Sequence, residues 1–433
     1  MYQGKTIGRN VVKLTFGTSY LLLVVILAYN VFFLVPWGFV EGGFNVADVA
    51  LALIWIGVIG GIIYSRQLPI WNNPVSWLVL SYLLIVAMHV SLAAINYGQP
   101  LFNGVVAARY QYFYGFYFLC LFLLKDVQRI GAFLNVLTVI SLIVYALALV
   151  NYLGPTILYH EKAEDWIAIR AGIQRIFIPH MPLINMAFFW QFAGWLTKNR
   201  LCKYAGLQTL LLSGAIIFQQ SRASILGTLI VVFAILLFYK KYKILFVGTA
   251  LGVMVIGLAS VVMQENILLQ PFSGTAHFVQ EEEGTKGGRI SQFELDFDEF
   301  IKHPFIGSGL VAIRVSELDR LKRGDFAERT RTADLGYTHW IKNFGIVGII
   351  WVIAFLYVLL STGIRLLNNS DGELATLSLF ATAYVAFVGI TMITLNHLMV
   401  KERIIVLCLV AALLTRLRMR GSSALVNVES RGR

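Results

Sequence analysis

Arg222 stands where a side chain could bind a phosphate-bearing molecule. It belongs to the polar stretch Gln219–Ser224, which separates two apolar runs with almost no loop between them. An arginine at membrane depth costs from about 2.5 to more than 10 kcal/mol, so it should face a wet cavity or a paired anion. A guanidinium offers a fork of donors that matches phosphate oxygens. We interpret the stretch as a clamp for a lipid phosphate or pyrophosphate, with a snorkelling arginine in a tight turn as the alternative.

A larger polar segment runs from Gln264 to Trp340, and it carries 13 of the 23 acidic residues of the chain. Inside it, the run from Arg289 to His303 has apolar residues at helical spacing and charged residues on the other faces. The apolar positions are Phe293, Phe297, Phe300 and Ile301. We predict an amphipathic helix that ends at Pro304, lies at a membrane surface and roofs a cavity.

Membrane-spanning elements must position these groups. Apolar residues make up 58% of the chain and charged residues 13%, and the mean hydropathy is +0.74. A span needs about 20 apolar residues, and about twelve stretches approach that length, including 104–124 and 244–263. Because backbone groups in lipid must be hydrogen-bonded within their own segment, we expect an all-α integral membrane protein with about 12 transmembrane helices.

The basic residues indicate how the chain is oriented. A net charge of +12 is compatible with a nucleic-acid partner, but the basic residues fall at helix ends, so we expect no nucleic acid. They occupy alternate junctions, which indicates an even number of spans with both termini in the cytoplasm. The 264–340 segment would then lie outside the cytoplasm, since long loops translocate largely regardless of charge.

The expected organisation has four parts. They are a first transmembrane group of about nine spans over 1–263, a loop over 264–340, the last three spans over 341–415 and a cytoplasmic tail over 416–433. The sequence contains no P-loop, dinucleotide-type glycine fingerprint, His-Glu-x-x-His pair or Gly-x-Ser-x-Gly elbow. Energy coupling by a bound nucleotide is therefore not expected.

Three sequence elements stand in order around the long loop. They are Ser221-Arg222 at the head of an apolar run, Arg289 followed by His-Pro-Phe-Ile-Gly-Ser-Gly at 303–309, and the stretch 334–348, which ends in Gly-Ile-Val-Gly. In this order they resemble the bacterial O-antigen ligase and O-antigen polymerase family of polytopic membrane glycosyltransferases, over about residues 210–365. The resemblance implies a GT-C-like architecture in the bacterial inner membrane, with a periplasmic loop and a periplasmic active site.

The resemblance also implies a reaction and its partners. The donor would be an undecaprenyl-pyrophosphate-linked glycan among the membrane lipids, and the acceptor would be a lipid-linked glycan for a polymerase or lipid A-core for a ligase. Arg222 and Arg289 would neutralise charge that develops on the departing pyrophosphate. With two such cations no metal is strictly needed, and we expect no cofactor.

Two residues are candidates for the base that accepts the proton of the acceptor hydroxyl, Asp334 and His339. Ligases of the family typically carry a His-Asn pair in the last element, but the position counted back from Gly345 holds Asp334, followed by Leu335. We therefore favour a polymerase, with a ligase as the alternative. Structural roles stay open, since Asp334 could cap a helix and His339 could be an interfacial, hydrogen-bonded histidine.

Four further basic residues are less specific candidates for binding phosphate or glycan: Arg170, Arg175, Lys401 and Arg403. They can do so only if the polar ends of their helices converge. If the ends do not converge, these side chains are interfacial anchors, which short junctions commonly carry.

A lipid-linked glycan transporter is the main alternative of another class, because it too needs many spans and buried cations. A transporter would more naturally place polar residues and broken helices near the bilayer midplane in related halves. In this sequence the polar residues gather at one face beneath one large loop, which favours a glycosyltransferase over a transporter.

Overall fold

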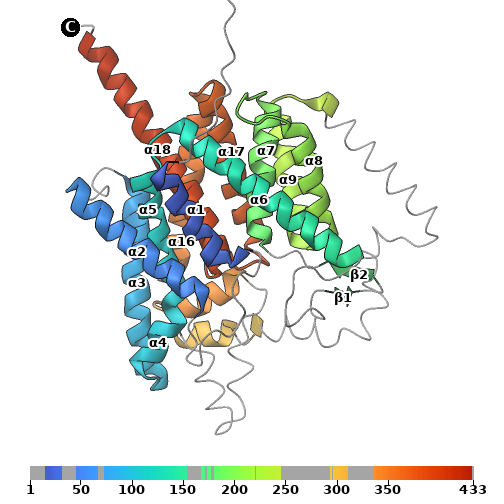
Figure 1. Cartoon of the computed structure of the whole chain (residues 1–433). Helices are drawn as coiled ribbons and strands as arrows, with labels where there is room; N and C mark the ends of the chain where they lie inside the picture. Colours follow the sequence, from blue (N-terminus) through green and yellow to red (C-terminus); the bar gives the residue numbers. More distant parts are fainter. Residues whose placement is uncertain are drawn as a thin grey trace, which may run out of the picture.

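The computed structural model describes residues 15–31, 45–66, 73–153, 167–170, 173–176, 180–219, 221–244, 293–294, 296–310 and 336–431. Within these ranges the chain forms a helical bundle with one 3-10 helix and one short hairpin (Figure 1). The elements are α1 (Phe16–Tyr29), α2 (Val46–Ser65), α3 (Pro74–Tyr97), α4 (Leu101–Ala108), η2 (Arg109–Tyr114), α5 (Gly115–Leu123), α6 (Val127–Leu153), β1 (Ile167–Arg170), β2 (Ile173–Ile176), α7 (Met181–Leu196), α8 (Ala205–Phe218), α9 (Arg222–Phe238), α16 (Gly336–Asn368), α17 (Gly372–Thr391) and α18 (Lys401–Arg431).

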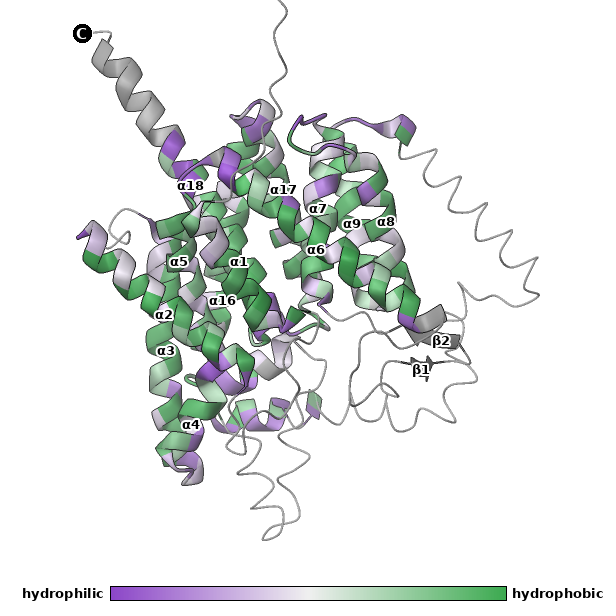
Figure 2. Ribbon diagram, in the orientation of Figure 1, coloured by the Kyte–Doolittle hydropathy of each residue, from purple (hydrophilic) through white to green (hydrophobic). Residues whose placement is uncertain are grey.

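The helices have the apolar character expected of a membrane protein. Among the described residues, five are long and apolar enough to cross a membrane: Val46–Ser65, Pro74–Tyr97, Gln128–Asn151, Trp340–Asn368 and Gly372–Thr391. Three shorter apolar helices cover Phe16–Tyr29, Ala205–Phe218 and Ala223–Phe238. Hydrophobic residues cover the helices, and hydrophilic residues gather near the two ends of the bundle (Figure 2). The expected all-α membrane bundle is thus confirmed in outline, and the hairpin of β1 and β2 adds a small antiparallel element to it.

Local signals explain several helix boundaries. Asn45 accepts a hydrogen bond from the Ala47 amide, and the Asp48 carboxylate accepts one from the Asn45 amide, so a capping box starts α2. Asn73 caps α3 just before Pro74, and Gly98 ends that helix in the left-handed conformation.

One expected span is not a single helix. Over 104–124, α4 ends at Ala108, the 3-10 helix η2 follows, and α5 begins at Gly115. η2 faces the start of α18, where the Gln111 amide donates to the Met399 carbonyl at 3.3 Å. The prediction of a continuous helix was wrong here, because hydropathy does not distinguish i→i+3 from i→i+4 hydrogen bonding. The expected span 244–263 lies outside the described residues after Ile244.

α17 occupies the middle of the bundle. It packs against α7 and α9 on one side and against α16 and α18 on the other, so it joins the α6–α9 group to the rest (Figure 1). A second anchor is an aromatic cluster where α3, η2 and α16 meet. Tyr82 stacks on Trp340 with ring centroids 5.3 Å apart, and Trp351 stacks on Phe355 at 4.8 Å. All four side chains are buried.

The stretch 304–310 docks on α16 through backbone hydrogen bonds. α16 is kinked at Gly345 (φ 58°, ψ −154°), which frees carbonyls and amides on either side of the kink. The bonds are Ser308 N–H to Lys342 O (2.9 Å), Gly309 N–H to Asn343 O (3.2 Å), Ile346 N–H to Pro304 O (2.9 Å) and Val347 N–H to Phe305 O (3.2 Å). The two glycine-containing elements found in the sequence are therefore the two partners of one backbone contact.

Glycine is required on the 304–310 side of this contact. Gly307 has φ 83°, and a Cβ there would collide with the backbone of Asn343. On the other side, the stretch contacts α3, where the Leu310 amide donates to the His89 carbonyl at 3.3 Å. The segment is thus held between α3 and α16.

The predicted amphipathic helix is helical over 296–302, and its charged face is the one that contacts the bundle. Asp296 is buried, with its carboxylate 3.1 Å from the Lys342 ammonium, and Glu299 accepts a hydrogen bond from the Tyr97 hydroxyl. Of the predicted apolar positions, Phe293 (48%), Phe297 (50%) and Ile301 (59%) are exposed and Phe300 is half-buried, and the following Phe305 is 72% exposed. Such an outward apolar face is what a helix lying at a membrane surface needs.

Candidate functional site

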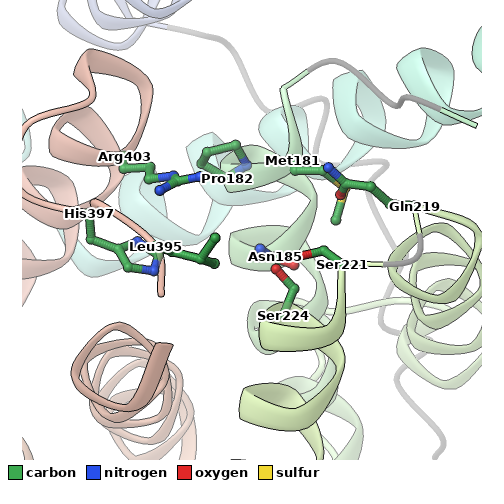
Figure 3. Close-up of a pocket in the computed structure, with 9 residues that line it drawn as sticks. All are labelled: Met181, Pro182, Asn185, Gln219, Ser221, Ser224, Leu395, His397 and Arg403. Atoms are coloured by element: carbon green, nitrogen blue, oxygen red, sulfur yellow. The ribbon is translucent and has the colours of Figure 1, made fainter. Parts of the chain in front are cut away.

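A polar pocket lies where α7, the α8–α9 joint and the α17–α18 turn meet (Figure 3). Between its lining atoms lie roughly 320 Å³ of unfilled space, part of which is open to solvent. Its lining residues are Met181, Pro182, Asn185, Gln219, Ser221, Ser224, Leu395, His397 and Arg403. Figure 3 shows His397 and Arg403 on one wall and Asn185, Ser221 and Ser224 on the other. Residues more than 170 positions apart in the sequence therefore share this pocket.

The α8–α9 joint supplies one wall. α8 ends at Phe218 with Gln219 as its C-cap, and Ser221 is the extended N-cap of α9, so the polar stretch forms the break between two apolar helices. Gln219 and Ser224 are buried. Arg222 is the first residue of α9, and its side chain lies outside what the structure describes.

The α17–α18 turn supplies the opposite wall. Past the end of α17, the backbone amide of Leu395 donates to the Thr391 carbonyl at 2.8 Å, and that of His397 donates to Leu395 at 2.9 Å. The Thr391 hydroxyl donates to the Phe387 carbonyl at 2.6 Å and lies 2.7 Å from His397 Nε2. These bonds hold the buried His397 ring in one orientation beside the pocket.

Charge in this region is positive. Burial lowers the pKa of His397 well below its usual value, and the neighbouring Arg403 cation lowers it further, so the imidazole is neutral at physiological pH. His180, which precedes the pocket-lining Met181, has its pKa lowered to about 4 by burial and by the charge of Lys401. Arg403 is the cation of the described pocket lining, and it lies near the neutral imidazole of His397.

The side chain of Lys401 makes two contacts next to the pocket. Its ammonium lies 3.5 Å from the Glu402 carboxylate and 5.4 Å from the centroid of the Tyr110 ring. Arg109, also near Tyr110, pairs with Asp48 at 3.4 Å. These contacts are those of anchoring side chains.

The other sequence-predicted residues are only partly described. Arg170 lies opposite Ile173 and Arg175 opposite Ala168 in the β1–β2 register, and their side chains lie outside the described part of the structure. Arg289 and Asp334 also lie outside the described residues. His339 is placed in the first turn of α16 by its backbone alone.

The start of α16 nevertheless contacts the pocket region. A Cβ on Gly336 would collide with the carbonyl oxygens of Met392 and Leu395, so the α16 backbone is pressed against the turn that carries His397. Asp334 is two residues before Gly336 in the sequence. Within the described ranges, no group of three or more His, Cys, Asp or Glu side chains is arranged to hold a metal ion.

Asn185 is a polar pocket residue for which the sequence indicated no role, and His397 is another. Asn185 is an amide inside the apolar run of α7, and it is buried. A polar side chain in such a run was the available signal, because a buried amide in an apolar helix needs a partner.

Comparison with protein families gives a match for part of the chain. Residues 207–353 match the family model described as O-antigen ligase. The expected resemblance over about 210–365 is thereby confirmed for this segment. The matched segment, 207–353, contains Ser221 and Ser224 of the pocket, whereas Asn185, His397 and Arg403 lie outside it. No curated protein matches the chain.

Proposed function

We propose that this chain is a metal-independent membrane glycosyltransferase that moves glycan from an undecaprenyl-pyrophosphate carrier to an acceptor glycan, as a repeat-unit polymerase. The observation that carries the proposal is the pocket, which joins Ser221 and Ser224 of the matched segment to Arg403 from outside it. A donor with a long lipid and a charged, polar head needs an apolar bundle with a polar, cationic site at one end. The pocket and the surrounding apolar helices have this combination.

In the proposed reaction, the acceptor hydroxyl oxygen bonds to the anomeric carbon of the donor. The bond from that carbon to the phosphate oxygen breaks, and undecaprenyl pyrophosphate leaves. Arg222 and Arg289 stabilise the negative charge on the leaving group, and Arg403 adds a positive charge on the opposite wall. Lys401, Arg170 and Arg175 are secondary candidates for holding phosphate or glycan.

The proton of the acceptor hydroxyl passes to Asp334 or His339. The preference for a polymerase rests on the acidic Asp334, which stands where the family's ligases carry histidine. The contact of Gly336 with the α17–α18 turn supports a role for this segment, because it brings the start of α16 beside the pocket wall.

We further propose that the pocket opens toward the periplasm of a bacterial inner membrane, with both termini in the cytoplasm. The alternation of basic residues along the chain supports this orientation. A ligase that transfers glycan to lipid A-core remains the alternative within the family, and a lipid-linked glycan transporter is the alternative of another class.

The test uses purified protein in lipid with undecaprenyl-pyrophosphate-linked repeat units, with and without lipid A-core. A ladder of longer glycans on the lipid carrier, lost in Arg289→Ala and Asp334→Ala, is the expected result. Glycan that appears only on lipid A-core would instead establish the ligase. No transfer under either condition, together with carrier movement across proteoliposomes, would contradict the enzyme.

A further inference from the structure

We propose that the pocket is a sugar subsite in which hydroxyl groups donate hydrogen bonds to His397 Nδ1 on one wall and to Asn185 Oδ1 on the other. The inference rests on the proposed function and names the part of the glycan that this cavity takes. The sugar belongs either to the donor or to the acceptor, and the two sources present the same hydroxyl chemistry.

The hydrogen-bond network determines the tautomer of His397. The Thr391 hydroxyl has one hydrogen, which it donates to the Phe387 carbonyl at 2.6 Å. Toward His397 Nε2, at 2.7 Å, the hydroxyl can therefore only accept, so Nε2 carries the ring hydrogen. A neutral imidazole with hydrogen on Nε2 has a lone pair on Nδ1, and the lowered pKa of this ring keeps it neutral.

Both proposed acceptors are unused in the described structure. His397 is 3% exposed and Asn185 4% exposed, yet His397 Nδ1 and Asn185 Oδ1 have no hydrogen-bond partner among the described residues. Buried polar atoms are nearly always hydrogen-bonded, because a buried polar atom without a hydrogen bond destabilises the fold. Both residues line the same pocket, so a molecule in the pocket can satisfy both.

The chemistry of the lining favours a sugar. Two acceptors need hydrogen-bond donors from the ligand, and an ionised phosphate has none to offer. Arg403, on the same wall as His397, supplies donors and charge to an anion. A sugar next to a pyrophosphate presents hydroxyl donors and anionic oxygens together, which matches this combination of acceptors and cation.

Two isosteric variants separate the proposed acceptor from the structural hydrogen bond. In His397→Asn, the side-chain oxygen can replace Nδ1, while the Nε2–H bond to Thr391 is lost. In His397→Gln, the amide can still reach Thr391, but the acceptor at the Nδ1 position is lost. Asn185→Leu removes the acceptor on the other wall. Thermal unfolding of each variant in detergent checks that it folds.

The readout is direct binding, so that it does not depend on turnover. The probes are undecaprenyl pyrophosphate without sugar, lipid-linked repeat units extracted from cells that lack this protein, and the free glycan released from these units by mild acid. We expect His397→Gln and Asn185→Leu to weaken binding of the sugar-bearing probes about tenfold each, the effect of one lost hydrogen bond, with His397→Asn closer to wild type. The sugarless carrier should bind all variants equally.

The outcomes distinguish the sources and the competing explanations. A loss confined to the lipid-linked units places the bound sugar beside the carrier pyrophosphate, and a loss that extends to the free glycan shows that the subsite binds glycan without its carrier. Unchanged binding of every probe means that water satisfies the two atoms and overturns the proposal, as does an equal loss with the sugarless carrier. If sugar-dependent binding behaves as expected but no transfer occurs, the proposed function fails and the subsite stands.

Discussion

At the scale of single residues, Arg403 is the charge on which the pocket depends. It lines the pocket, and its charge lowers the pKa of His397 in addition to the larger effect of burial. The same charge would attract an anion that enters the pocket. The interaction is electrostatic and preorganised, since Arg403 belongs to the first turn of α18.

We expect Arg403→Ala to lower kcat/KM for glycan transfer by about 10²-fold, which is typical of removing one preorganised stabilising group. Arg403→Lys should recover part of the activity, because an ammonium keeps the charge but not the planar fork. The measurement is the initial rate of ladder formation. Arg365→Ala is the matched control, since Arg365 is exposed at the far end of α16. Full activity in Arg403→Ala would contradict a role in binding or catalysis.

Gly307 is a second residue with a specific requirement. Gly307→Ala would combine a strained positive φ with a collision against the Asn343 backbone. Gly98→Ala is the matched control, because Gly98 also has a positive φ (64°) but nothing within 4 Å of a Cβ. We expect about 1–2 kcal/mol of destabilisation from strain in Gly98→Ala, and at least about 2 kcal/mol more in Gly307→Ala. Thermal unfolding in detergent measures both, and equal losses would show that the close contact does not matter.

At the scale of elements, the helix 296–302 is bound to the bundle by its charges. Burial opposes ionisation of Glu299, but hydrogen bonds from Tyr97 and Lys302 and the charges of Lys302 and His303 outweigh it, so the pKa of Glu299 is lowered from its usual 4.5. The folded state therefore favours the ionised carboxylate. Its contribution to stability is present above the unfolded pKa and is lost as pH falls through the lowered folded pKa.

We therefore expect the unfolding temperature of the wild type to fall as pH decreases below about 4.5, the usual carboxyl range. The unfolding temperature of Glu299→Gln should fall less steeply over the same range, because this variant has no carboxylate at position 299 to protonate. Glu294→Gln, at an exposed position of the same segment, is the control and should follow the wild type. Parallel pH profiles for Glu299→Gln and the wild type would contradict this account.

At the scale of the whole molecule, the orientation of the bundle can be tested with cysteines. The natural cysteines, Cys120, Cys202 and Cys408, are buried. In a variant where all three are replaced by Ala, we expect a membrane-impermeant maleimide to label Asp298→Cys in intact cells from the periplasm. Lys241→Cys should be labelled only after the membrane is permeabilised. Both positions are exposed, so the reverse pattern would overturn the proposed topology.

The sequence predicted the class and many elements of this bundle, because these depend on local properties. The bounds of α2 and α3 follow from apolar length and from Asn45, Asn73 and Gly98 as caps. The break at Arg109–Tyr114 could not be predicted in the same way, since a change in backbone hydrogen bonding leaves the hydropathy unaltered.

The residues of the candidate site likewise fall into those that the sequence indicated and those that it did not. The polar residues near helix ends, such as Ser221 and Arg403, were visible in the sequence because charge and hydroxyl groups interrupt apolar runs. Asn185 was not selected, because its importance depends on what surrounds it rather than on its neighbours in the chain.

By itself, the sequence determined that the chain is a helical membrane protein, which apolar length and unsatisfiable backbone groups in lipid require. It also determined the ordered elements that resemble the O-antigen ligase family. Only the tertiary structure decided that Asn185, Ser221, His397 and Arg403 share one pocket, because that depends on α17 packing against α7 and α9 on one side and α18 on the other. Long-range packing of this kind depends on the fit of whole helix faces, which no local spacing specifies.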